Sequence, residues 1–446
     1  MYLSLADQRA RRQSRAGSPA VPFRLSPVIL WLGIVSLLTD ISSEAVAAVL
    51  PVYLTGALGL SILAYGFLDG LQQGISAVVR IAAGWTSDTV DRPKWVAAAG
   101  YGLSMLARAG LLLSASVGAV ASVIMLDRIG KGIRTAPRDS LITGAAQPEH
   151  LARSFGVHRM LDTVGATAGP LLAFAVLLLI PQGYSTVFVL SLGAAVLGVA
   201  VLILLVPNLR SRRAEVSAVP ADAAAAEGTH ALRARPRIST RQALRSLNTA
   251  TVRRLLLAAG VLSLLSVGDG FLYLLLLTSS GFNPALFPLL FVGTNVAYLL
   301  LAVPLGRAAD RWGRHRVFLL GHCGLLVSYV CAGFGGAGFG GMGATVVCLL
   351  ALGAFYAATD GVLAALMGGL VPERVRATGI AAAQTVVAVG RLVASTGFGV
   401  LWYTLGPETA LWLTAGTLAL ALPGAAWLLR PAGPTLSADR NGAADD

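Results

Sequence analysis

Long apolar runs separated by short polar segments dominate the chain. Each run has about 20 to 29 residues, enough to cross a hydrocarbon core of about 30 Å as a helix rising 1.5 Å per residue. The runs fall at 28–54, 62–84, 95–117, 119–141, 153–180, 184–206, 252–278, 282–305, 315–336, 341–369, 377–404 and 407–430. Backbone groups find no hydrogen-bond partner in lipid, and the runs are too long for barrel strands. The pattern therefore predicts an all-α polytopic membrane protein with twelve transmembrane helices.

The composition agrees with this interpretation. Apolar residues make up 56% of the chain and charged residues 12%, with a mean hydropathy of +0.74, whereas a soluble domain has about 25% charged residues. The three cysteines, Cys323, Cys331 and Cys348, lie in apolar runs without C-x-x-C spacing. Neither a disulfide framework nor a thiolate metal site is indicated.

The net charge of +13 follows the topology. Basic residues gather in alternate connections, namely 1–24, 92–94, Arg153, 210–254, 307–316 and 374–376, and the opposite connections have no lysine or arginine. The positive-inside rule places the basic connections and both termini in the cytoplasm of a bacterial cell with the helices in its inner membrane. This distribution argues against nucleic-acid binding. Asp40 and Glu44 in the first run favour a retained span over a signal sequence.

A repeated polar segment divides the chain into two halves. The segment that begins at Gly84 reads GWTSDTVDRPK and recurs at Gly306 as GRAADRWGRHR, and 306 − 84 gives a separation of 222 residues. The pattern predicts two six-helix pseudo-repeats at 26–206 and 251–430, flanked by an N-terminal arm at 1–25, a linker at 207–250 and a tail at 431–446. Duplicated membrane halves are typical of transporters.

The motifs of these halves resemble those of the major facilitator superfamily. Its loop signature, Gly-x-x-x-Asp-x-x-x-Arg, is matched by Gly84, Asp88, Arg92 and by Gly306, Asp310, Arg314, although Asp91 replaces the usual second glycine of the first copy. Its fourth-helix pattern is matched by Arg128 and Gly132. The resemblance implies two halves that rock around a substrate site at the membrane midplane.

A further motif on the fifth span resembles the pattern of exporters in this superfamily. Gly165, Gly169 and Pro170 match its Gly-x-x-x-Gly-Pro ending, but the trailing glycine pair is missing. The resemblance implies antiport. In the loop signatures, a small residue permits close packing, the Asp can face the positive end of a neighbouring helix, and the Arg can pair with an acid such as Asp139. These contacts either lock an inner gate or merely fasten the loop.

Ionisable residues inside the spans are the strongest indication of chemistry, since each costs roughly 2.5 to 3.5 kcal/mol at a helix centre. Asp40 and Glu44 lie four residues apart on one face of the first span, and Asp127, Lys131 and Arg134 share a face of the fourth. We expect these acidic and basic faces to oppose each other across a water-filled cavity. The candidates for proton coupling are Asp40, Glu44 and Asp162. The candidates for the substrate cavity are Arg108, Asp127, Arg128, Lys131, Arg134, Asp269 and Asp360.

A carboxyl in such a cavity can bind a proton in one state and release it in another, and the cations can bind an anionic substrate or neutralise the acids. Alternatively, the charges only satisfy one another as internal ion pairs. A divalent-cation site of Asp40, Glu44 and His158 is another alternative, although no ligand spacing favours it.

The sequence therefore predicts a monomeric secondary transporter that expels a small molecule against protons, with no cofactor and no metal. An organic-anion importer or exchanger, a divalent-cation exporter and a membrane sensor without transport are the alternatives. An enzyme is not expected, because no nucleophile with a base and no metal quartet is apparent.

Overall fold

The computed structural model describes residues 25–87, 93–114, 116–147, 150–207, 248–280, 283–334, 341–372 and 375–430, and this part of the chain is helical throughout. The first half contains α2 (Pro27–Val52) with a short π-helical extension, η1 (Tyr53–Ala57), then α3 (Ile62–Ser87), α4 (Pro93–Leu112), α5 (Val117–Ala145), α6 (Leu151–Leu179) and α7 (Tyr184–Leu205). The second half contains α11 (Ala250–Leu264), α12 (Asp269–Ser280), the 3-10 turn η3 (Pro284–Leu286), α13 (Phe287–Trp312), α14 (Arg314–Phe334), α15 (Gly341–Leu370), α16 (Arg376–Leu405) and α17 (Pro407–Leu428).

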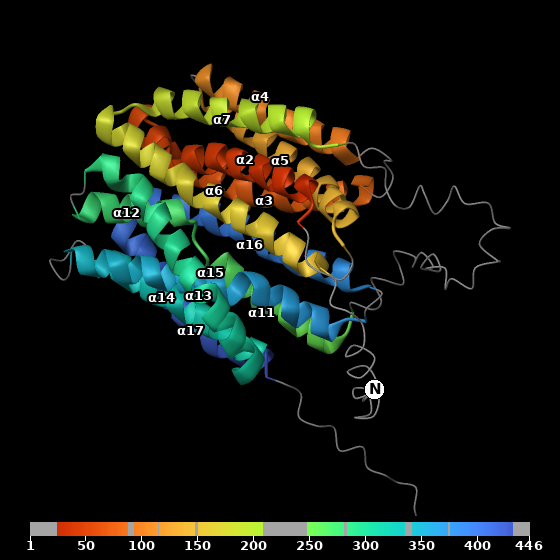
Figure 1. The fold of residues 1–446 in the computed structure, drawn as a ribbon. Coiled ribbons are helices and arrows are strands. Elements are labelled where there is room, and N and C mark those ends of the chain that lie inside the picture. The colour runs from red at the N-terminus through yellow and green to blue at the C-terminus, as the bar shows by residue number, and fades with distance from the viewer. Residues whose placement is uncertain are drawn as a thin grey trace, which may run out of the picture.

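The helices form two stacked bundles (Figure 1). The start of α2, the end of α7, the start of α11 and the end of α17 lie at the same end of the molecule, which we call the linker end. Each half thus crosses the bundle six times, as the apolar runs predict. The expectations for the N-terminal arm, most of the linker, the tail, Asp88 and Arg92 fall outside the described residues.

Ten segments of the described chain are long and apolar enough to cross a membrane, and α3 and α5 are not among them. Polar side chains cause this difference for α5, which carries Asp127, Arg128, Lys131, Arg134 and Arg138. Because α5 packs against α3 and α4 inside the first bundle, most of these charges face protein rather than lipid. A helix with this composition is stable in a membrane only when neighbouring helices pair its charges.

The span predicted at 252–278 is matched by a candidate membrane span at Ala250–Thr278, but its helix is interrupted. The helix ends at Leu264 and restarts at Asp269. Between these residues the Tyr329 hydroxyl accepts a hydrogen bond from the Val267 N–H and donates one to the Leu265 carbonyl, both at 2.8 Å. A tyrosine from α14 therefore replaces hydrogen bonds that the interruption removes, which is how a broken helix is tolerated inside a membrane. The local sequence is apolar, so hydropathy alone does not reveal the interruption.

The largest contact between the two halves joins α3 to α16, at the end of the molecule away from the linker end, and α13 also packs against α6. A Cβ on Gly66 would lie 2.7 Å from the Ser395 carbonyl oxygen, and one on Gly70 would lie 2.6 Å from the Leu392 carbonyl oxygen. Phe271 of α12 packs edge-on against Phe398, with ring centroids 5.0 Å apart. We call this contact between α3, α12 and α16 the joint. Only glycine permits such close backbone approach there.

Candidate functional site

The charged residues of α5 contact four neighbouring helices, α2, α3, α4 and α6. Lys131 lies 3.7 Å from the Glu44 carboxylate of α2, and Arg134 lies 3.7 Å from the Asp40 carboxylate of the same helix. The predicted opposition of an acidic and a basic face is confirmed. The predicted water-filled cavity between them is wrong, because the opposing side chains form ion pairs directly.

The two ion pairs differ in their access to solvent. The side chains of Arg134 and Asp40 are 6% and 12% exposed, whereas those of Lys131 and Glu44 are 40% and 30% exposed. The Arg134 guanidinium also lies over the Tyr101 ring, 4.5 Å from its centroid. Asp40 is therefore held in a protein interior, and Glu44 lies near its entrance.

Asp127 points away from this interface. Its carboxylate pairs with Arg108 of α4 at 3.0 Å, and both side chains are buried. Arg108 also donates from Nε to the Ser42 hydroxyl at 3.3 Å, and Ser42 contacts Ser191 of α7 at 2.9 Å. Sequence periodicity groups Asp127 with Lys131 and Arg134, but packing directs it to α4 because Arg108 lies there.

Asp162 connects α6 to the same network. Its carboxylate lies 3.8 Å from Arg138 and 3.6 Å from Arg159. The Asp162 and Asp40 side chains lie close enough for their charges to interact. Two carboxyl groups can share a hydrogen bond only when one of them carries a proton, since an ionised carboxylate has no donor. We call these neighbouring carboxyl groups of α2 and α6 the carboxyl pair.

His158 lies beside the carboxyl pair but makes its own contact. Its Nε2 is 3.0 Å from the Ser36 hydroxyl, and Arg138 donates to the same hydroxyl at 3.4 Å. No group of three His, Cys, Asp or Glu side chains suited to a metal ion occurs among the described residues. Asp40, Glu44 and His158 each contact a different partner, so the arrangement gives no support to a divalent-cation site.

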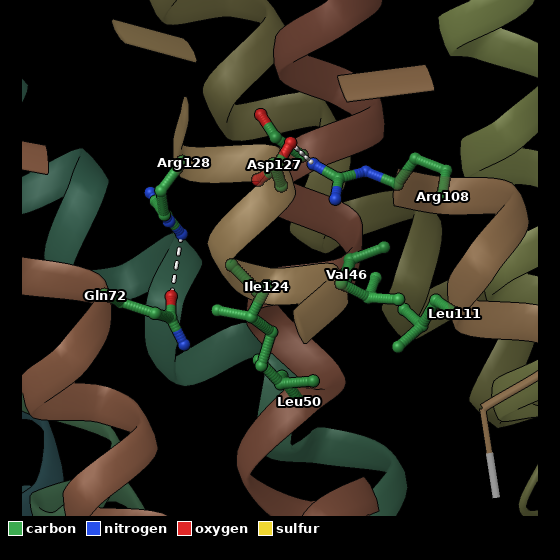
Figure 2. A pocket seen from close by; sticks show the side chains of 11 residues that line it. Val46, Leu50, Gln72, Arg108, Leu111, Ile124, Asp127 and Arg128 are labelled. Carbon is green, nitrogen blue, oxygen red and sulfur yellow. Dashed lines mark hydrogen bonds and ion pairs between the residues drawn. The ribbon is translucent and has the colours of Figure 1, made fainter. Parts of the chain in front are cut away.

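A pocket opens between α2, α3, α4 and α5 near the middle of the first bundle (Figure 2). Figure 2 shows Arg108 and Asp127 on one side and Arg128 with Gln72 on the other, with Val46, Leu50, Leu111 and Ile124 labelled around the apolar part. Arg128 donates to Gln72 Oε1 at 2.8 Å. Arg108, Asp127 and Arg128 are the predicted cavity residues that the structure places in this pocket.

The predicted cavity residues of the second half form a separate cluster. Asp269 accepts a hydrogen bond from the Tyr356 hydroxyl at 2.5 Å. Arg391 lies 5.6 Å from the centroid of the Tyr356 ring and 4.0 Å from the Asp360 carboxylate, whose side chain is 55% exposed. Asp269 and Asp360 do not line the pocket of the first half.

Asp69 of α3 belongs to the joint and was not among the predicted site residues. Its carboxylate accepts a hydrogen bond from Ser395 at 2.5 Å and leaves no space for a Cβ on Gly268. The only sequence signal was an acidic residue in an apolar run. The pairing with α16 and with the interrupted helix depends on contacts between distant parts of the chain.

The loop motifs are partly described. Gly84 lies in α3, and Arg92, expected to pair with an acid such as Asp139, lies outside the described residues. Asp139 pairs with Arg138 at 3.0 Å. In the second copy, which begins at Gly306 in α13, Arg314 pairs with Asp310 at 3.7 Å and donates to the Ala365 carbonyl of α15 at 2.9 Å.

The exporter-type motif brings α6 against α2. A Cβ on Gly165 would lie 2.5 Å from the Leu37 carbonyl oxygen, and one on Gly169 would lie 2.7 Å from the Ala45 backbone nitrogen. Pro170 follows inside α6 and is buried. These glycines set the separation of the helices that carry Asp40 and Asp162.

We expect Gly169→Val to separate α6 from α2 and to lower the melting temperature of the detergent-purified protein. Overpacking of this kind costs about 1 to 3 kcal/mol. Gly156→Val on the same helix is the matched control, because a Cβ there meets nothing within 4 Å. Equal melting temperatures for the two variants would show that the close contact is not needed for stability.

The fold and its buried charges define a membrane transporter built from two halves. The family model described as the Major Facilitator Superfamily matches residues 32–278 and 255–445. The chain belongs to the major facilitator superfamily, a family of transporters and not of enzymes.

Several known proteins are similar to this multi-pass membrane protein. An uncharacterized MFS-type transporter of Methanocaldococcus jannaschii is 29% identical over 391 residues, which cover 86% of this chain and 90% of that protein. The crystal structure of the nucleoside transporter NupG has a TM-score of 0.70 at 14% identity and covers 91% of this chain and 99% of its own. A POT family transporter in complex with 5-aminolevulinic acid has a TM-score of 0.70 at 14% identity, covering 89% and 95%. At these identities the solved structures show the fold alone.

Proposed function

We propose that the protein exports a small molecule from a bacterial cell in exchange for protons, by alternating access of a binding site inside the membrane as its two halves rock. It lies in the inner membrane as a monomer, with the linker end facing the cytoplasm. The proton gradient drives transport, and no cofactor is required. The single observation that carries the proposal is the row of carboxylates, Glu44, Asp40 and Asp162, that faces the basic residues of α5. Proton binding to such a carboxylate removes its ion pair and can thereby change helix packing.

The arrangement of charge along α5 supports a proton path. From the pocket toward the linker end, the helix presents Lys131 to Glu44, Arg134 to Asp40 and Arg138 to Asp162. Successive basic residues lie about one helical turn apart along α5, so the carboxylates that face them also follow one another closely and can pass a proton in short steps. Protonation of one carboxylate releases its basic partner, and the released cation is then free to attract the next acid or a substrate.

The joint supports alternating access. Its contacts close the halves at the end of the molecule away from the linker end. Rocking of the halves would open this end and close the other. The resemblance of Gly165, Gly169 and Pro170 to the exporter pattern supports the outward direction, and the two glycines bring the helix that carries Asp162 against α2.

Gradient-driven flux in everted membrane vesicles tests the proposal. Vesicles from producing and non-producing cells are energised with an imposed proton gradient and incubated with a bacterial metabolite extract, and mass spectrometry identifies the accumulated solutes. We expect at least one solute to accumulate only with the protein. Asp40→Asn, Asp162→Asn and Glu44→Gln should each lower this accumulation, because an amide keeps the shape of the carboxyl group but cannot exchange a proton.

Glu408→Gln is the matched control, since this carboxylate is exposed in the first turn of α17. It should leave the accumulation unchanged. Unchanged gradient-driven flux in Asp40→Asn, Asp162→Asn and Glu44→Gln alike would refute the coupling assignment. Flux that a protonophore leaves intact would instead favour an exchanger or an importer driven by its own substrate.

A further inference from the structure

The pocket of the first half holds two polar groups without partners. Arg128 Nε and Ser43 Oγ are both buried atoms that make no hydrogen bond in the described structure. Ser43 is only 9% exposed, and both residues line the same pocket. Buried polar atoms are normally satisfied, so two unmet groups at one site indicate a missing ligand.

The chemistry of these two groups selects the ligand. The guanidinium Nε–H is a donor only, and the serine hydroxyl has a proton to donate. Gln72 Oε1 accepts from Arg128 Nη2, the neighbour of Nε in the guanidinium, and helps to fix its plane. The ligand atoms that fit between them are acceptors, as in a carboxylate or a phosphonate.

The charge of the pocket points to an anion. Arg108 and Asp127 line it as an ion pair at 3.0 Å and cancel each other. No carboxylate lies within ion-pair distance of Arg128 in the part of the chain that the structure describes. Arg128 therefore has no direct ion-pair partner in the described chain, although the Asp127 and Asp69 carboxylates act on its charge from further away. A bound anion would supply a direct partner.

The rest of the pocket is apolar. Val46, Leu50, Leu111 and Ile124 form a wall beside the polar end. A hydrocarbon body buried against this wall would be removed from water, which favours binding. The cavity volume is about 20 Å³, which holds about one water molecule. A larger ligand must therefore widen the pocket by separating α2 from α5.

We propose that this pocket binds the anionic end of an amphipathic organic acid, with Arg128 and Ser43 as the donors and the apolar wall as the contact for its body. This assignment rests on the proposed transport function and names its substrate class. It also gives Arg128 a role distinct from proton transfer, which the geometry assigns to the carboxyl pair.

Ligand-induced stabilisation of the full-length protein in detergent tests the assignment. Melting temperatures are measured over a concentration series of benzoate, phenylphosphonate, benzamide and benzylamine, without any proton gradient. We expect benzoate or phenylphosphonate to stabilise the protein, and neutral benzamide and cationic benzylamine to bind at least about tenfold more weakly, since a charge-assisted hydrogen bond contributes about 1.5 to 3 kcal/mol. The comparison of the two anions distinguishes a carboxylate site from a phosphonate or phosphate site.

Variants separate this site from a general effect of charge. Arg128→Gln should weaken the apparent affinity for the anion about 10- to 100-fold, and Ser43→Ala should weaken it by a smaller factor. Arg128→Lys keeps the charge and should give an intermediate affinity for the anion. This variant replaces Arg128→Gln in the comparison if Arg128→Gln does not fold. Arg253→Gln removes an exposed cation near the start of α11, outside the pocket and the carboxyl pair, and should leave the anion affinity unchanged.

Equal stabilisation by benzoate and benzamide, no stabilisation by either anion, or unchanged anion affinity in Arg128→Gln would overturn the assignment. These outcomes do not depend on proton coupling. Failure of the coupling experiment with intact anion binding would refute the proton mechanism alone, and the reverse result would refute the substrate class alone.

Discussion

Replacement of Gly66 by leucine is expected to hold the two halves apart at the joint while leaving each half folded. A Cβ at this position lies 2.7 Å from the Ser395 carbonyl oxygen and 3.1 Å from the Gly399 Cα. Both neighbours are backbone atoms of α16, so a side-chain rotation cannot relieve the clash. An overpacking cost of about 1 to 3 kcal/mol reduces the closed population about 5- to 150-fold. Transport that requires this closure should fall by a similar factor.

Pulsed electron paramagnetic resonance provides the measurement. Spin labels at Ser61 and Thr404, in a protein whose native cysteines are replaced by alanine, report the separation of α3 and α16 at this end. Gly66→Leu should shift the distance distribution to longer values. Gly397→Leu on α16 is the matched control, because nothing lies within 4 Å of its Cβ position. An unchanged distribution in Gly66→Leu would contradict the role of the joint.

Replacement of Arg108 by methionine is expected to destabilise the first half severely. The change leaves the Asp127 carboxylate, whose side chain is 8% exposed, without its partner at 3.0 Å. Removal of one partner from a buried ion pair costs about 3 to 5 kcal/mol. The double variant Arg108→Met and Asp127→Leu should recover most of this loss, since both charges are then absent.

A double-mutant cycle based on unfolding of the purified protein checks this prediction. Recovery in the double variant identifies Arg108 and Asp127 as a structural ion pair, the alternative that the sequence left open for each charge. Lack of recovery would show that Arg108 stabilises the protein through other contacts, such as its hydrogen bond to Ser42. Arg128→Met should cost far less stability than Arg108→Met, because it leaves no buried carboxylate unpaired.

Much of the fold follows from hydropathy, because every span in lipid must be apolar and must pair its backbone groups within a helix. The predicted runs match helices from α2 to α17, and the interruption after Leu264 is the main departure from them in the described chain. That interruption depends on the Tyr329 hydroxyl and on the Asp69 carboxylate beside Gly268. Both partners lie on other helices, and a single-span pattern contains no information about them.

The candidate site was partly predictable for a related reason. Helical periodicity correctly placed Asp40 and Glu44 on one face and opposed them to Lys131 and Arg134. It could not rank alternative partners, so it did not anticipate that Asp127 pairs with Arg108. Asp40 and Asp162 come near each other on two helices whose separation is set by Gly165 and Gly169. Such contacts emerge only from packing.

The most direct test of the proton mechanism is an infrared measurement of the carboxyl pair. The C=O stretch of a protonated carboxyl group is recorded for the protein in lipid at neutral pH, in the wild type and in Asp40→Asn, Asp162→Asn and Glu408→Gln. We predict that the wild type and Glu408→Gln share a band component that both Asp40→Asn and Asp162→Asn lose. A band that is the same in all four proteins would contradict a proton held between Asp40 and Asp162.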